Sequence, residues 1–383
     1  MIKLLSYLFP FLVNYVCGGV FFITALRCSQ ANAPGWVVGA TLSTWSLVYS
    51  VVSFIAGKVT TVKNAVVLIS AGGLMITAAS AGFLLFPGVY TQFIWIALTG
   101  IAAATYCTSF QVFAKSIEQN QDTGVVRATA LYTASWSLGM ATGPFVFGLL
   151  PVNASFIINA VLGVLIAGGI VLVSRNVQKK ENIQSSEMAP RTKDSSAFRD
   201  CVLAGWIIGG TGTIAIFVIR CLVPYRANLL SFSRAEAGII LAVVSFVQAF
   251  SALALIGVRT MMYKALPVVI AGVCGIVSLL LFGYGSGKVV FAAAAVLFGL
   301  YSGYFYFMFV YHSLVSPTNS TRYVAINEII VGIMGTAGPF AGGLLTTPST
   351  SGTAFPVMAV CCGLSIVFAV VFFKRNVAEL HEK

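Results

Sequence analysis

Charged residues are scarce in this sequence. Only 8% of its 383 residues are Asp, Glu, Lys or Arg, whereas 58% are hydrophobic, and an ordinary soluble domain carries about a quarter charged residues. This composition excludes a soluble enzyme and a disordered chain. The apolar runs also lack the alternation over ~10-residue segments that marks an outer-membrane barrel. We therefore predict an all-α membrane protein with many transmembrane helices.

Clusters of reactive or metal-binding side chains are also missing. The eight cysteines contain no CxxC pair, and the two histidines, His312 and His381, lie far apart, so neither a disulfide framework nor a metal site is indicated. No nucleophile, carboxylate dyad or phosphate loop emerges, which argues against an enzyme. We expect no cofactor beyond a proton or other ion gradient, no metal and no nucleic-acid partner.

The apolar runs are long enough for twelve membrane crossings, since one helical crossing needs ~20 apolar residues. The predicted spans are residues 4–26, 36–56, 65–86, 91–113, 128–150, 154–174, 201–223, 235–256, 265–283, 289–311, 322–345 and 353–373.

The net charge of +12 has an explanation in membrane topology, because Lys and Arg collect in cytoplasmic loops. If both termini are inside, seventeen basic residues fall in the inner segments and five at the outer ends. We expect a multi-pass protein of a plasma or bacterial inner membrane with both termini in the cytoplasm.

One connection, Arg175–Arg199, is long, hydrophilic and without apolar periodicity, which is typical of a flexible linker. It divides the chain into a six-helix half at 1–174, a cytoplasmic linker at 175–199 and a second six-helix half at 200–383. The halves share a pattern: Gly143-Pro144-Phe145 recurs as Gly338-Pro339-Phe340 at an offset of 195 residues. This indicates an internal repeat.

The twelve spans, the central linker and the Gly-Pro segments together resemble the major facilitator superfamily over essentially the whole chain. The resemblance implies two six-helix repeats around a central cavity that opens alternately to each side. It also gives Gly139, Gly143, Pro144, Gly338 and Pro339 a conformational role, because glycines let helices approach closely and proline lets them bend. We expect a monomer whose partners are the lipid bilayer and a small-molecule substrate.

The sequence departs from the family pattern at two places. The loop after the second span, Gly57–Asn64, has the glycine and two basic residues of the family motif but no acid. A latch on that side must use helix dipoles, hydroxyls, or Glu118 and Asp122 in the next inner loop. Ile96 stands where drug exporters of the family often have an arginine, which weakens the interpretation as a proton-driven drug exporter.

Glu328 is the only carboxylate well inside an apolar run. A carboxylate at low dielectric favours its protonated form, so Glu328 is the candidate for proton coupling. The alternative is a structural pair with a basic residue such as Arg322.

Two arginines, Arg27 and Arg220, close spans that are related by the repeat. Their guanidinium groups could face each other and bind a carboxylate or phosphate. The alternative is that both extend to the outer headgroups. Arg226 and Arg234 are expected to be solvated loop residues.

Polar and aromatic positions at mid-membrane depth are further candidates for substrate contacts, although aromatic residues at helical spacing more often serve packing. The predicted substrate-binding residues, besides the two arginines, are Asn14, Tyr15, Tyr106, Trp136, Gln248, Tyr301 and Tyr304.

The sequence thus predicts a secondary active transporter that moves a small organic solute, with an anion among the candidates, by proton-coupled alternating access. One alternative is an exporter of amphipathic drugs or lipids. Another, of a different class, is a membrane sensor or assembly partner that does not transport.

Overall fold

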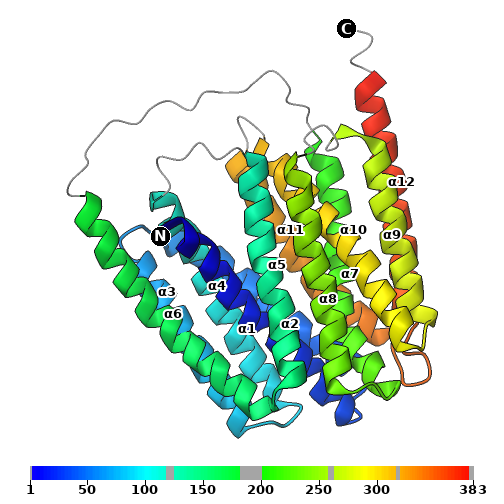
Figure 1. Ribbon diagram of the computed structural model, residues 1–383, viewed down its shortest axis with the longest axis horizontal. Coiled ribbons are helices and arrows are strands. Elements are labelled where there is room, and N and C mark those ends of the chain that lie inside the picture. Colours follow the sequence, from blue (N-terminus) through cyan, green and yellow to red (C-terminus); the bar gives the residue numbers. More distant parts are fainter. Residues whose placement is uncertain (1, 118–124, 182–200, 258–262, 316–319, 379–383) are drawn as a thin grey trace.

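The computed structural model describes residues 2–117, 125–181, 201–257, 263–315 and 320–378, and these form twelve α-helices (Figure 1). The prediction of twelve helices is confirmed. The helices are α1 (Ile2–Gln30), α2 (Gly35–Val59), α3 (Ala65–Leu85), α4 (Thr91–Ile117), α5 (Val125–Leu149), α6 (Val152–Glu181), α7 (Val202–Leu229), α8 (Arg234–Ala254), α9 (Ala265–Tyr284), α10 (Lys288–Val315), α11 (Ser320–Leu344) and α12 (Ala354–Ala378).

Ten of the described helices are long and apolar enough to cross a membrane. The other two, α5 and α11, carry the Gly-Pro segments. Helix α6 continues through residues 175–181 of the segment expected to be the linker. The rest of that segment, and Glu118 and Asp122, lie outside the described residues.

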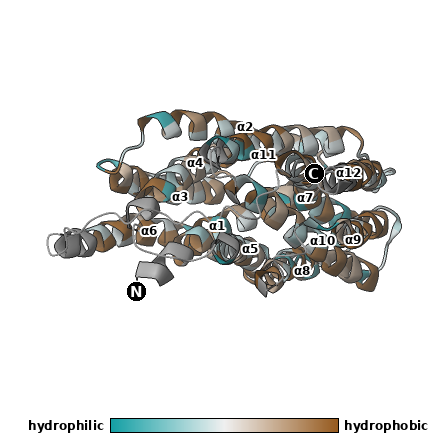
Figure 2. Cartoon of the chain, turned by 90° about the horizontal axis from the view of Figure 1, so that it is seen from above, coloured by the Kyte–Doolittle hydropathy of each residue, from teal (hydrophilic) through white to brown (hydrophobic). Residues whose placement is uncertain are grey.

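The helices form two halves, α1–α6 and α7–α12, which lie side by side when the molecule is seen along the helices (Figure 2). Across the junction, α2 packs on α11 and α5 packs on α8, while α1 contacts α7. The beginning of α1 and the end of α12 lie at the same end of the bundle (Figure 1). We call this end the termini side and the opposite end the far side.

The two Gly-Pro segments occupy equivalent places in the two halves. A Cβ at Gly143 of α5 would lie 2.5 Å from the backbone N of Gly19 in α1, and one at Gly338 of α11 would lie 2.8 Å from Ile214 in α7. Because only glycine leaves room for these approaches, α5 packs tightly on α1 and α11 on α7.

Each Gly-Pro segment also reaches across the junction. The Pro144 carbonyl meets Gly238 of α8, and the Pro339 carbonyl meets Gly39 of α2. The repeat therefore places the same motif at the α5–α8 contact and at the α2–α11 contact between the halves.

The charge distribution predicts which side faces the cytoplasm. Single cysteines replacing Lys63, between α2 and α3, and Tyr90, between α3 and α4, would lie at opposite ends of the bundle, and both positions are exposed. In a background without native cysteines, we expect an impermeant reagent to label Y90C in intact cells and K63C only after permeabilisation. Labelling of K63C in intact cells would reverse the orientation.

Candidate functional site

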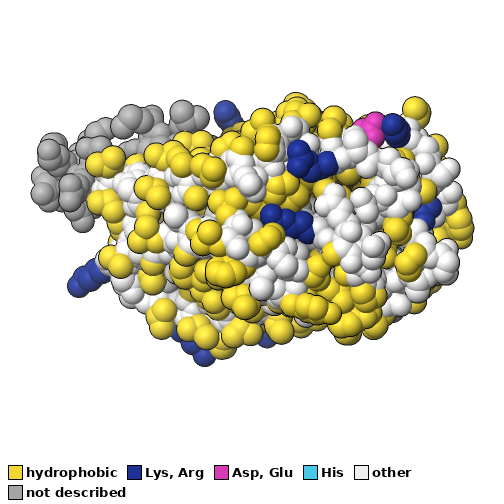
Figure 3. Space-filling view, turned by 90° about the horizontal axis from the view of Figure 1, so that it is seen from below, with side chains coloured by type: hydrophobic (Ala, Val, Ile, Leu, Met, Phe, Trp, Pro, Cys, Tyr) yellow, Lys and Arg dark blue, Asp and Glu magenta, His cyan; other side chains and the backbone are white. Residues whose placement is uncertain are grey.

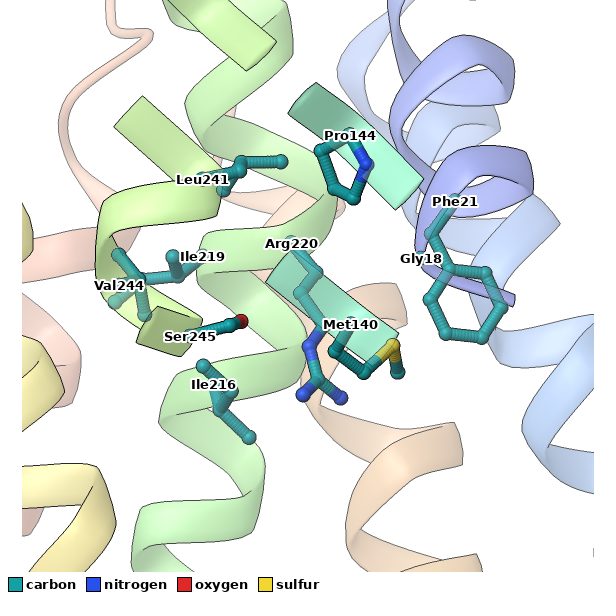
Figure 4. Close-up of a pocket in the computed structure, with 10 residues that line it drawn as sticks. All are labelled: Gly18, Phe21, Met140, Pro144, Ile216, Ile219, Arg220, Leu241, Val244 and Ser245. Atoms are coloured by element: carbon teal, nitrogen blue, oxygen red, sulfur yellow. The ribbon is translucent and has the colours of Figure 1, made fainter. Parts of the chain in front are cut away.

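Arg220 lies at the junction of the two halves, two thirds of the way along α7. Only 7% of its surface is exposed, and its guanidinium lies over the ring of Phe217, 5.4 Å from the ring centre. The side chain reaches back toward the level of Ile216 (Figure 4), since helical side chains lean toward the N-terminus of their helix. The charge therefore lies near the middle of the bundle.

A pocket beside Arg220 is built by both halves (Figure 4). It is predominantly apolar, narrow and partly open to the outside. The lining residues are Gly18 and Phe21 of α1, Met140 and Pro144 of α5, Ile216, Ile219 and Arg220 of α7, and Leu241, Val244 and Ser245 of α8.

The charge of Arg220 has no protein counter-ion among the described side chains. Among the described side chains the structure shows the ion pair Lys288–Glu236 at 2.6 Å, which lies at the surface and does not involve Arg220. The Nη2 atom of Arg220 has no hydrogen-bond partner. An unpaired buried cation is costly in a medium of low dielectric constant. Such a group is suited to receive an anion from outside the protein.

Aromatic rings from both halves surround Arg220. Phe217 lies 6.4 Å from the ring of Trp45 in α2, and Trp45 stacks on Tyr49 at 4.8 Å. Trp136 of α5 meets Tyr306 of α10 edge to face at 4.9 Å, and Tyr306 is close enough to Arg220 to interact with its charge. Of the residues that line the pocket only Phe21 is aromatic, so these other rings lie near Arg220 but outside the lining of the pocket.

A second group of polar side chains lies on the termini side of these rings. Glu328 of α11 is exposed to solvent, yet it is within electrostatic range of Tyr49, Cys107 and Tyr132, from α2, α4 and α5 of the other half. Gln111 of α4 and Tyr132 are exposed as well. These five residues therefore line a space between the halves that solvent enters, which we call the vestibule.

The residue before Glu328 fixes its position. The Asn327 Oδ1 accepts hydrogen bonds from Trp206 Nε1 of α7 at 2.8 Å and from Ser313 Oγ of α10 at 2.9 Å. Because Asn327 is buried and held by two neighbouring helices, the adjacent carboxylate is directed into the vestibule. No ion pair with Arg322 is found among the described side chains, and Arg322 is exposed.

On the far side the halves are joined by hydrogen bonds. Ser29 of α1 donates to the Tyr225 carbonyl of α7 at 3.2 Å and accepts from Asn228 at 2.9 Å. Figure 3 looks onto this face, where hydrophobic side chains are widespread and charged ones are few. These hydrogen bonds hold α1 and α7 together at the far side.

The expectation that Arg226 and Arg234 are solvated loop residues is wrong. Arg234 begins α8 and donates to the carbonyls of Gly148 at 3.3 Å and Leu150 at 2.9 Å, at the end of α5 in the other half. Arg226 is 9% exposed and donates to Ser351 Oγ and the Gly285 carbonyl, both at 3.0 Å. Gly148 and Leu150 lie at the C-terminal end of α5, and Gly285 lies at the C-terminal end of α9. The carbonyl oxygens at a helix C-terminus attract a cation.

Arg27 and Arg220 are not brought together as the sequence suggested. Arg27 donates to the Phe83 carbonyl of α3 at 3.1 Å and lies 5.1 Å over the ring of Phe156 in α6. Its guanidinium therefore belongs to the interior of the first half, whereas that of Arg220 faces the junction.

Two other candidates do lie at the junction. Gln248 of α8 is fully buried and donates to Ser137 of α5 at 2.7 Å, and Trp136 meets Tyr306 as described above. Asn14 instead donates to the Pro10 carbonyl one turn earlier in its own helix.

The predicted tyrosines are buried. Tyr301 contacts Cys362 of α12 and the rings of Phe298 and Phe305 inside the second half. Tyr106 stacks on Phe110 inside the first half. Tyr15 and Tyr304 are each 6% exposed. Tyr301 and Tyr106 therefore serve packing within one half, because their neighbours come from that half alone.

Five residues of the site did not stand out in the sequence: Tyr49, Cys107, Gln111 and Tyr132 of the vestibule, and Phe217 beside Arg220. Tyr132 precedes Trp136 by four residues, and Phe217 precedes Arg220 by three, so each shares a helix face with a candidate residue. Helical spacing around the strongest candidates was the signal that could have found them.

Comparisons with known proteins agree with this architecture. A family model described as Major Facilitator Superfamily matches residues 4–314. The solved structure of the nucleoside transporter NupG is similar, with a TM-score of 0.67 and 15% identity over 98% of this chain and 99% of NupG. None of the curated protein sequences compared matches significantly.

Two further structures show the same fold. The human organic anion transporter MFSD10 gives a TM-score of 0.64 at 11% identity, covering 95% of this chain and 98% of its own. A bacterial homolog of the human lysosomal transporter Spinster, inward-facing and unoccupied, gives 0.64 at 14% identity, covering 98% and 95%.

Proposed function

This chain belongs to the Major Facilitator Superfamily, whose members are multi-pass membrane transporters and not enzymes, and from that membership we propose that it carries a small organic anion by proton-coupled alternating access. The observation that supports an anionic substrate is the buried guanidinium of Arg220, which faces the junction without a protein counter-ion.

The conformation of the two halves, joined at the far side and open at the vestibule, fits this proposal. With both termini in the cytoplasm, the vestibule opens inward and the far side, where Ser29, Tyr225 and Asn228 join the halves, is the closed outer side. In this state a substrate exchanges between Arg220 and the cytoplasm.

The two charged groups have separate roles in the proposed cycle. The anion binds at Arg220 and neutralises a charge that would otherwise be buried alone, which stabilises closure of the halves around it. Glu328 takes up or releases a proton in the vestibule, where solvent reaches it. Closure of the inner side then requires its neutral form, because an unpaired carboxylate is costly to bury.

Removing the charge of Arg220 tests the proposal. We expect R220Q to weaken binding of the responding organic anions about 10- to 100-fold, because a charge-assisted hydrogen bond contributes ~1.5–3 kcal/mol, while R220K keeps an intermediate affinity. The ligands are found by thermal-shift screening of purified protein against organic acids, sugars, nucleosides, lipids and cationic drugs, since ligands that bind the folded state raise its melting temperature.

The matched control is K63Q, which removes an exposed positive charge from the loop after α2. It should leave affinity unchanged. If anions bind R220Q as tightly as the wild-type protein, Arg220 is not the anion site. If only cationic drugs or lipids raise the melting temperature, the exporter of amphipathic compounds becomes the better interpretation.

A further inference from the structure

We propose that the pocket beside Arg220 is a chloride site, and that chloride competes there with the organic anion of the proposed transport. The competition rests on the proposed function, whereas the chloride site does not depend on it. Three features of the pocket support the site: a buried charge without a partner, a hydroxyl in the same lining, and a very small space.

The pocket holds a charge that needs a partner. Arg220 lines it, is 7% exposed and keeps Nη2 without a hydrogen-bond partner. Arg27, Arg226 and Arg234, in contrast, donate to carbonyl or hydroxyl oxygens. A water molecule beside Arg220 leaves the positive charge uncompensated in apolar surroundings, which is costly, whereas an anion compensates it. The pocket therefore favours an anion over water.

A second polar side chain lies in the same lining. Ser245 of α8 is 4% exposed, and its hydroxyl points toward the Arg220 side chain (Figure 4). Because a hydroxyl hydrogen turns about its C–O bond, Ser245 can donate to an anion held by the guanidinium. The other lining residues are glycine, proline or apolar side chains. A halide suits this donor set, since a single atom accepts hydrogen bonds from any direction.

The space restricts the anion to a very small one. It has room for about one water-sized sphere, and a chloride ion is only slightly larger than a water molecule. One wall cannot recede easily, because a Cβ at Gly18 of α1 would already lie 3.1 Å from the Pro144 ring of α5. Overfilling such a packed space is unfavourable. Chloride therefore fits where polyatomic anions require the lining to move.

The pocket places its occupant between the two halves. Arg220 and Ser245 belong to the second half, and Gly18, Phe21 and Met140 belong to the first. An anion bound there contacts both halves and stabilises this conformation, because a ligand favours the state that binds it. An organic anion that reaches Arg220 has to displace the chloride and move side chains of the lining. The two anions therefore compete.

The test measures the melting temperature of the purified wild-type protein in sodium salts of equal ionic strength. Gluconate, which is too large for the pocket, is the reference, and chloride, bromide and thiocyanate are the probes. We expect saturating chloride to raise the melting temperature by about 2–4 °C. Bromide should bind within about 3-fold of chloride, and thiocyanate at least about 10-fold more weakly. Non-specific binding of weakly hydrated anions gives the opposite order, with thiocyanate strongest.

Three variants locate the site. R220Q should weaken chloride binding at least about 10-fold and S245A about 3- to 10-fold, because each removes a donor. M140A enlarges the space and should bring thiocyanate to within about 3-fold of chloride. The control S251A removes a hydroxyl of α8 that donates to the Leu300 carbonyl outside the pocket, and it should bind chloride as the wild-type protein does. The order of the salts on the wild-type protein decides the question even if R220Q does not fold.

The outcomes separate the chloride site from the proposed function. If chloride gives no stabilisation over gluconate, if R220Q retains the effect, or if thiocyanate binds more tightly than chloride, the chloride site is refuted. Organic-anion transport then still stands where its ligands depend on Arg220. If chloride binds through Arg220 and the organic acids of the screen bind more weakly in chloride than in gluconate, both proposals are supported. If chloride binds through Arg220 and no organic acid does, the chloride site stands, whereas the competition and the proposed transport fail.

Discussion

G39V is expected to abolish transport by preventing the two halves from closing at the far side. Gly39 of α2 meets the Pro339 carbonyl oxygen of α11 so closely that any Cβ would overlap it, and that Cβ would also lie 3.2 Å from the Cα of Gly343. Both obstacles are backbone atoms of the other half, so they cannot turn aside as a side chain would. The valine therefore holds the halves apart at the far side.

The measurement is uptake into proteoliposomes together with the labelling of a single cysteine near the site from the outside. We expect no uptake from G39V and increased labelling from outside. The control G168V places the same side chain on an exposed position of α6, where a Cβ meets nothing within 4 Å, and it should transport normally. Normal uptake by G39V would show that α2 and α11 need not approach this closely during the cycle.

E328Q is expected to abolish proton-driven accumulation while substrate binding and counterflow exchange persist. Glutamine imitates the protonated acid, so the carrier can close but has no proton to exchange. Because Glu328 lies in the vestibule and Arg220 in the pocket beyond Phe217 and Trp45, the affinity for an anion should change little. Accumulation, exchange and melting temperature are measured on the same variant.

The control E236Q removes a carboxylate whose surface pair with Lys288 adds little to stability. It should accumulate substrate normally. A loss of stability in E328Q with exchange also lost would favour a structural role for Glu328. Normal accumulation would refute proton coupling through this residue, and a sodium-coupled or purely facilitative carrier would then be the better interpretation.

The architecture could be predicted from sequence because it depends on one-dimensional patterns. Span length follows from bilayer thickness, and the repeat is visible in the recurrence of Gly143-Pro144 as Gly338-Pro339. Arg220 and Glu328 could be selected as candidates because a charge inside an apolar run is rare and costly. These residues stand out whatever the packing is.

The rotation of each helix about its own axis could not be predicted. The helices are apolar on all sides, so the pattern does not distinguish a lipid-facing side from one facing the junction. For this reason Arg27 was paired with Arg220 although it points into the first half, and Tyr301 was placed at the cavity although it packs against α12. Tyr132 and Gln111 were missed for the same reason.

Arg234 joins the two halves on the far side, and its acceptors are backbone carbonyls, those of Gly148 and Leu150. A peptide oxygen does not titrate between pH 4 and 9, unlike a carboxylate acceptor, so this contact keeps its strength when the outside is acidified. A substitution at either acceptor residue also leaves the oxygen in place. Acidification of the medium therefore leaves the Arg234 contact intact, and the pH profile of transport should follow the titration of groups in the pathway.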